Sequence, residues 1–222
     1  MFKDISIVNL LSDLGDAFLE TGLMMGISLS LALIVGIPLG LVIFLTRKDI
    51  FWHNKIVNFI GGTLINIVRS LPFVILLILL LPLARILTGK TTGPLAATVS
   101  LSIASIAFFA RLVEGALSEV DKGVIEAAAS LGASPFTIIF HVLISEALPG
   151  LIRGFTVTAI SLVGFSAMAG VVGGGGIGFL AINYGYYRYQ TDVMIVTVVV
   201  LILIVQLLQI TGDSFAKKAD KR

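Results

Sequence analysis

The sequence predicts an all-α integral membrane protein with five transmembrane helices per chain. Hydrophobic residues make up 57% of its 222 residues and charged residues only 13%, whereas about a quarter of a soluble domain is charged. Mean hydropathy is +1.08, and several uncharged runs reach the ~20 residues that cross a bilayer. One compact bundle fits a chain of this length.

Cysteine is absent, and the two histidines, His53 and His141, lie far apart in polar stretches. We therefore expect no disulfide, no metal site and no cofactor in this chain. The formal charge of +2 is small. We expect the chain to lie in a lipid bilayer and to have no nucleic-acid partner.

Residues 1–20 carry four acids and one lysine, which is the wrong balance for a cationic secretion signal and predicts an amphipathic lead-in. A transmembrane domain of residues 21–213 follows, and its first span is the uncharged run 22–46. Two G-x-x-x-G pairs in this run either pack on another helix or reflect only how common glycine is in membrane helices. They are Gly22 with Gly26 and Gly36 with Gly40.

The second span is expected between Lys55 and Arg85, and only Arg69 interrupts it. Residues 70–84 are too few to cross a bilayer, so Arg69 must lie within the bilayer or just inside its edge. Its side chain either faces the bundle interior or a water-filled path, or it snorkels to the cytosolic headgroups, which we favour.

A Gly-Lys-Thr string at residues 89–91 is reminiscent of a phosphate-binding loop. That motif needs a further glycine five residues earlier, where Ala84 stands, and it follows a strand. We therefore expect an outer turn here and no ATP binding by this chain.

Three further spans are expected at residues 91–110, 155–172 and 193–212, and a basic tail follows at 214–222. The glycines of residues 173–178 disfavour a stable helix, because each costs about 1 kcal/mol there. They predict a turn or a close backbone approach. All four tyrosines follow this turn and indicate a belt at the membrane–water boundary. The serines of the third span bond either across helices or within their own helix.

Charge returns between apolar runs in the loop 119–149, which predicts two short helices joined by a sharp turn. Gly132 stands where a helix ends in the left-handed conformation. Ser134 and Pro135 are typical of the cap and first residue of the next helix. Small residues beside the carboxylate of Glu126 would let another protein's backbone approach closely.

This loop resembles the EAA loop of permease subunits of ABC importers. Glu126, Ala127, Ala128 and Gly132 match that motif, whereas Ser145 stands where proline is usual. The resemblance implies a type I ABC importer permease-like fold, in which the loop docks into a cleft of the ATP-hydrolysing subunit. The residues it assigns to ATPase coupling are Glu126, Ala127, Ala128, Gly132, Ala133 and Pro135.

Longer strings, RSLPFVILL from Arg69 and VGFSAMAGVVGGGGIG from Val163, look like the methionine-uptake permeases of this family. The resemblance implies a homodimer that works with two ATP-binding subunits and an extracytoplasmic substrate-binding protein or lipoprotein. ATP would be bound and hydrolysed by the partner, so this chain would not be an enzyme. The substrate implied is methionine; another polar amino acid is the alternative.

The fourth span offers a candidate substrate path at Ser161, Gly164, Phe165 and Met168. Ser161, Phe165 and Met168 recur at spacings of four and three residues on one helical face, and Gly164 thins the helix beside them. Periodicity alone favours plain helix packing, and the resemblance shifts the interpretation toward a path.

Charge asymmetry predicts the orientation in the cell (inner) membrane. Eleven of the 15 Lys and Arg, Arg69 included, fall inside when the N-terminus is outside and the C-terminus is cytoplasmic. A self-sufficient carrier or channel would need an acid or histidine deep in a span, and none is expected there. An intramembrane enzyme would need a base beside one of the span serines, and no histidine is near them.

Overall fold

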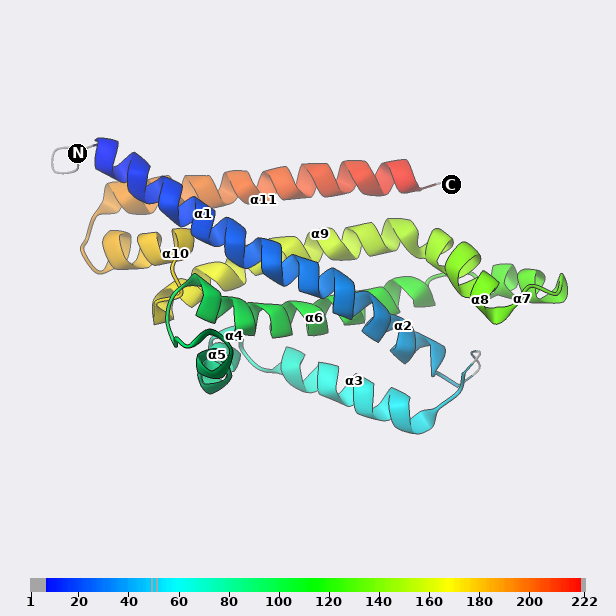
Figure 1. Ribbon diagram of the computed structural model, residues 1–222. Helices are drawn as coiled ribbons and strands as arrows, with labels where there is room; N and C mark the ends of the chain where they lie inside the picture. Colours follow the sequence, from blue (N-terminus) through cyan, green and yellow to red (C-terminus); the bar gives the residue numbers. More distant parts are fainter. Residues whose placement is uncertain (1–6, 49, 51, 221–222) are drawn as a thin grey trace.

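The computed structural model is an elongated bundle of helices and describes residues 7–48, 50 and 52–220 (Figure 1). The loop 119–149 lies at one end, which we call the loop end. The glycine-rich turn of residues 173–176 lies at the opposite end, the turn end. The α-helices are α1 (Ile7–Leu31), α2 (Ile37–Leu45), α3 (Lys55–Ser70), α4 (Phe73–Leu79), α5 (Leu81–Thr88), α6 (Pro94–Ser118), α7 (Lys122–Ser130), α8 (Pro135–Thr137), α9 (Ile144–Ala169), α10 (Gly176–Leu180) and α11 (Thr191–Ala219).

The first span is longer than the uncharged run predicts. A π-helical turn, Ala32–Gly36, joins α1 to α2 without a break, and the apolar part covers Leu11–Leu45. The described part of the predicted lead-in is therefore the first turns of the same helix, and no helix boundary falls at residue 20. Residues 1–6 of the lead-in lie outside the described residues.

Only one of the two G-x-x-x-G pairs packs closely. A Cβ on Gly40 would lie 2.6 Å from the backbone oxygen of Ala110, and one on Gly36 would lie 3.2 Å from the ring of Phe109. Cβ atoms on Gly22 and Gly26 would meet nothing within 4 Å. The second pair therefore brings α2 against α6, and the first pair leaves an open surface on α1.

The second predicted span is broken rather than straight. Helices α3 and α4 meet at a bend of 106°, because Pro72 cannot donate a backbone hydrogen bond and forces Leu71 into an extended conformation (ψ 133°). Helix α5 follows after Leu80 and ends at Gly89, whose φ is +74°. The Gly-Lys-Thr string therefore forms a turn, as predicted.

Arg69 lies near the end of α3, just before the bend. Lys55 starts α3 at the loop end, and Arg69 lies 14 residues along the helix, a rise of about 21 Å. The side chain points over the ring of Phe108 in α6, with 5.7 Å between the guanidinium carbon and the ring centroid. The guanidinium therefore packs against α6, and snorkelling to the cytosolic headgroups stays a prediction.

Helix α6 extends eight residues beyond the predicted end at Ala110. It is the most buried span, at 67% of its most apolar window, and forms the centre of the bundle. Two of its serines bond across helices, because the hydroxyl of Ser102 lies 3.3 Å from that of Ser28 and Ser105 donates to the Ser28 carbonyl over 3.1 Å.

The fourth span begins inside the loop rather than after it. Helix α8, a π-helical turn (Ile138–Leu143) and α9 form one continuous helical path of 38 residues from Pro135 to Val172. Pro149 lies within α9, so the helix does not end there as the sequence suggested. Membrane helices accommodate an internal proline when neighbouring backbone groups readjust.

The glycine-rich turn is a place of close backbone approach, as predicted. Gly173, Gly175 and Gly176 all have positive φ. The Glu20 carboxylate accepts from the Gly176 N–H over 2.6 Å, so α1 caps the short helix α10. Gly178 itself is helical, which corrects the expectation that the whole string avoids a helix.

Four helices are long and apolar enough to cross a membrane, or five if the bent pair of α3 and α4 counts as one span. Helix α11 continues through the predicted tail to Ala219, and residues 221–222 lie outside the described residues. Tyr186, Tyr187 and Tyr189 are exposed near the turn end, as a boundary belt requires.

Candidate coupling loop and translocation face

The turn in the loop 119–149 has the geometry that its residues predict. The carboxylate of Asp121 caps α7 by accepting from the Gly123 N–H over 2.7 Å. Gly132 takes a φ of +81° after α7. The Ser134 hydroxyl then accepts from the Thr137 N–H at the start of α8, and Pro135 occupies its first turn. Local chemistry therefore fixes the sharp angle between the two helices.

The predicted coupling residues lie together on the outside of this turn. Glu126, Ala127, Gly132 and Pro135 are exposed, and Ala128 and Ala133 are half-buried. No residue of α7 is buried. The tip also displays apolar side chains, since Leu131 is 89% exposed and Phe136 is 64% exposed. Large apolar residues displayed together beyond the spans indicate a surface that another protein covers.

The base of the loop is anchored more firmly than its tip. Ile139 and Leu143 are fully buried, and Ile125 packs against the same apolar cluster, which includes Phe44 and Leu117. The ring of Trp52 meets that of Phe136 edge to face at 5.8 Å between centroids. A force on the exposed tip would therefore reach the spans through these contacts.

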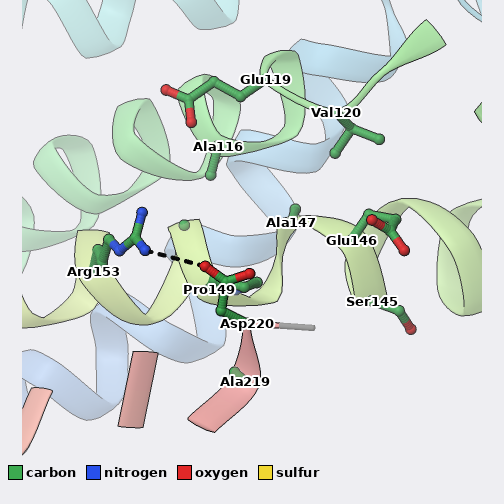
Figure 2. A pocket seen from close by; sticks show the side chains of 11 residues that line it. Ala116, Glu119, Val120, Ser145, Glu146, Ala147, Pro149, Arg153, Ala219 and Asp220 are labelled. Atoms are coloured by element: carbon green, nitrogen blue, oxygen red, sulfur yellow. Dashed lines mark ion pairs between the residues drawn. The ribbon is translucent and has the colours of Figure 1, made fainter. Parts of the chain in front are cut away.

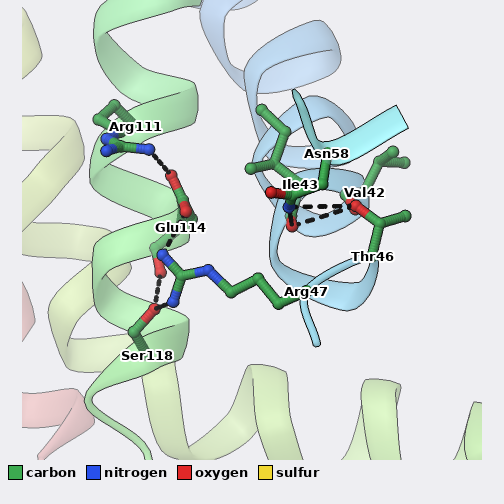
Figure 3. Close-up of polar contacts among 8 residues, drawn as sticks. All are labelled: Val42, Ile43, Thr46, Arg47, Asn58, Arg111, Glu114 and Ser118. Atoms are coloured by element: carbon green, nitrogen blue, oxygen red, sulfur yellow. Dashed lines mark hydrogen bonds and ion pairs between the residues drawn. The ribbon is translucent and has the colours of Figure 1, made fainter. Parts of the chain in front are cut away.

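A buried carboxylate fixes the loop end of the bundle. Glu114 of α6 is only 4% exposed and pairs with both Arg47, just after α2, and Arg111 (Figure 3). Arg47 also donates to the Ser118 hydroxyl over 2.8 Å. Nearby, the Asn58 amide donates to the Ile43 carbonyl over 2.6 Å and ties α3 to α2. The positive charges of two arginines thus neutralise the buried negative charge of Glu114.

This cluster allows a test that separates charge from packing. Replacing both arginines, Arg47→Gln with Arg111→Gln, leaves a buried carboxylate unpaired, and such losses cost about 3–5 kcal/mol. We expect a clearly lower thermal midpoint in detergent for this double variant. Adding Glu114→Gln to it should recover most of the loss, because no buried charge then remains. A triple variant as unstable as the double would contradict the assignment.

A small pocket of about 120 Å³ lies between α6, the start of α9 and the end of α11 (Figure 2). Glu119, Glu146 and Arg153 line it, and Arg153 pairs with Asp220 at 3.6 Å. Both partners are partly exposed, so this pair contributes at most about 1 kcal/mol. It holds the end of α11 against α9 beside the loop.

The four predicted path residues do not share one surface. Met168 is 45% exposed, Gly164 is exposed and Ser161 is half-buried on the same side of α9. The ring of Phe165 instead stacks on Phe73 of α4, with centroids 4.7 Å apart and planes 12° apart. Gly164 also lines a groove of about 360 Å³ between α9 and α11.

Sequence reasoning missed two features of the site. Glu114 lies beyond the predicted end of the third span at Ala110 and was not singled out, although the spacing of Arg111 and Glu114 predicts a pair on one helix. Sequence reasoning also missed a row of polar side chains along one side of α3. Its signal is the spacing of Thr63, Asn66 and Arg69 on one side of an otherwise apolar helix.

The chain is a bundle with four or five helices that are long and apolar enough to cross a membrane, and it displays an exposed loop beyond them. This is the architecture of a membrane transport component. The chain belongs to the family of binding-protein-dependent transport system inner membrane components, which matches residues 32–222. It is a permease subunit of an ABC transporter and a membrane protein.

Curated relatives and a solved structure agree with this family. The methionine import system permease protein MetP of Bacillus subtilis is 52% identical over 181 residues, which cover 82% of each chain. The probable D-methionine transport system permease protein MetI of Vibrio cholerae is 44% identical over 203 residues, which cover 91% of this chain and 90% of the relative. A chain of the MetNI methionine ABC transporter, in an inward-facing crystal form, matches with a TM-score of 0.94 and 37% identity over 98% of this chain and 100% of that chain.

Proposed function

We propose that this chain moves methionine across the cell membrane as the permease subunit of an importer. The names of its curated relatives support methionine as the substrate, and the close structural likeness to the methionine transporter supports it further. Phe165 and Met168 offer an aromatic ring and a thioether, which suit the soft, apolar side chain of methionine.

The proposed partners are a second copy of the chain, two ATP-binding subunits and an extracytoplasmic substrate-binding protein. The exposed tip of the loop 119–149 is the observation that supports the ATP-binding subunits as partners, since Leu131 and Phe136 stay largely exposed in the described part of the chain. The exposed side of α9 at Gly164 and Met168 supports a second copy, which would enclose a path between the two chains. ATP is bound by the partner, and this chain needs no cofactor of its own.

The proposed orientation places the loop end in the cytoplasm. The C-terminus lies on that side and the N-terminus on the outside, because α11 runs from the turn end toward the loop end (Figure 1). The loop end gathers most cations, including Arg47, Arg111 and Arg153. Ten of the 15 Lys and Arg lie on that side even when Arg69 is left out, as the positive-inside rule requires.

The mechanism that follows is alternating access. Closure of the ATP-binding subunits draws the two loops 119–149 together, and the continuous helix from Pro135 to Val172 tilts with them. This opens the path to the outside, where the binding protein delivers its ligand, and hydrolysis resets the inward-facing state. This chain forms no covalent intermediate.

Transport in vesicles tests the class. Vesicles with this chain alone should take up no methionine, and uptake should appear when the ATP-binding subunits, the binding protein and ATP are supplied. Uptake by this chain alone would instead indicate a self-sufficient carrier.

The path on α9 predicts the effect of added bulk. Met168→Trp should reduce methionine uptake at least tenfold while the complex still assembles, because the indole fills space beside Gly164. Leu203→Trp, at an exposed position of α11, is the matched control and should transport normally. Unchanged uptake by the Met168 variant would assign this face to helix packing.

A further inference from the structure

The side of α3 that faces away from the bundle is divided into two flanks. One flank is apolar and exposed, with Ile60, Leu64 and Ile67, as contact with lipid requires. The other flank is polar and also exposed. It consists of Thr63, Asn66, Arg69 and Ser70, spaced so that they follow one side of the helix. An exposed polar flank on a membrane helix faces water or another protein rather than lipid.

Arg69 is the only charge on this flank, and its side chain is exposed along the length of the span rather than at the loop end. Its guanidinium contacts Phe108, which is 10 residues from the loop end of α6 and 14 from the turn end. These separations are about 15 Å and 21 Å, so the charge lies near the mid-length of α6, away from both ends of this span. A cation at such a position in a span is costly unless it has a partner or water.

Arg69 has no anionic partner within the described part of the chain. The ion pairs formed by those residues involve Arg47, Arg111 and Arg153 instead. Phe108 covers one face of the guanidinium, which is a favourable cation–π contact. The N–H donors of an arginine lie in the plane of the group, so this contact leaves them available, and their fork fits a carboxylate.

The end of the polar flank is close in the chain to the aromatic pair, because Arg69 precedes the bend after α3 and Phe73 begins α4. Val68, next to Arg69, packs in the same apolar cluster as Phe73 and Phe165, and Phe165 stacks on Phe73. A small molecule beside Arg69 could therefore place an anionic end at the guanidinium and an apolar side chain toward the aromatic pair. A zwitterionic amino acid has this shape.

We propose that Arg69 is a substrate-binding residue of the path and binds the α-carboxylate of the transported amino acid. This inference rests on the proposed function, since it assigns a role within the path for methionine. The substrate carboxylate replaces water molecules at the Arg69 guanidinium during passage. The polar flank of α3 keeps that part of the path hydrated.

The experiment compares ligands that differ only in the carboxylate. Radiolabelled methionine is bound to the purified complex of this chain with its ATP-binding subunits, without the binding protein, and is competed with unlabelled methionine or with methioninol, which lacks the carboxylate. The wild-type complex should prefer methionine at least tenfold, which is typical of a hydrogen-bonded charge. Arg69→Gln should remove that preference, and Arg69→Lys should retain part of it.

Uptake into vesicles with the binding protein provides the second measurement. Arg69→Gln should lower methionine uptake at least tenfold while ATP hydrolysis and subunit assembly persist. Arg85→Gln, at an exposed arginine of α5, is the control and should behave as wild type. Normal uptake with unchanged ligand preference in Arg69→Gln would overturn the inference, and so would loss of assembly, which would make Arg69 an interface residue. A wild-type complex that takes up no methionine would overturn the proposed function as well.

Discussion

Glu126→Arg should separate this chain from its ATP-binding subunits and abolish transport. The carboxylate is exposed beside Ala127 and Gly132 on the loop tip, so a longer side chain of opposite charge obstructs the approach of a partner and repels the cations that the carboxylate would attract. Central interface residues typically contribute at least 2 kcal/mol, which corresponds to binding weaker by about 30-fold.

Co-purification and ATP-dependent uptake measure this effect. Asp13→Arg, an equal charge reversal at an exposed acid of α1, should leave both unchanged. Gly132→Trp should act like Glu126→Arg, because its φ of +81° disfavours any side chain and the ring would stand on the docking surface. An intact, ATP-responsive complex with either loop variant would contradict the proposed role of the loop 119–149.

Gly178→Ala should prevent stable folding of the turn end. A Cβ on Gly178 would lie 2.5 Å from the backbone oxygen of Ala167, where α10 crosses the end of α9. Overpacking typically costs about 1–3 kcal/mol, and the upper part of that range is expected here because backbone cannot move aside as a side chain can. The thermal midpoint and the yield of monodisperse protein in detergent report the loss.

Gly115→Ala is the matched control for this substitution. Gly115 lies within α6, and a Cβ there would meet nothing within 4 Å. Alanine is favoured over glycine inside a helix by roughly 0.5–1 kcal/mol, so this variant should be as stable as wild type or slightly more stable. Equal stability of the two variants would show that the crossing of α9 and α10 is looser than described.

Features fixed by neighbouring residues could be predicted from the sequence. The turn at Gly132, the cap at Ser134 and the first helical residue Pro135 depend on local backbone chemistry, and all three are confirmed. The uncharged runs located the long apolar helices, four or five by the count of the structure, because the bilayer demands a minimum length. The docking and path roles stay predictions, since a single chain contains no partner and no substrate.

Features fixed by distant residues could not be predicted. The burial of Glu114 depends on Arg47, 67 residues away, and no local pattern joins them. The bend at Pro72 was hidden because the runs on both sides are equally apolar. The continuity of α8 with α9 was missed because Pro149 suggested an end, whereas the rest of the bundle stabilises the helix through it.

The continuous helical path from Pro135 to Val172 spans 38 residues and about 57 Å. It therefore connects the loop 119–149 directly to the turn end. A rotation at Pro135 reaches Val172 only in part, because the π-helical turn (Ile138–Leu143) and Pro149 are places where a helix bends. The size of the opening at the turn end then depends on where α9 pivots against α6, rather than on the force applied at the loop 119–149.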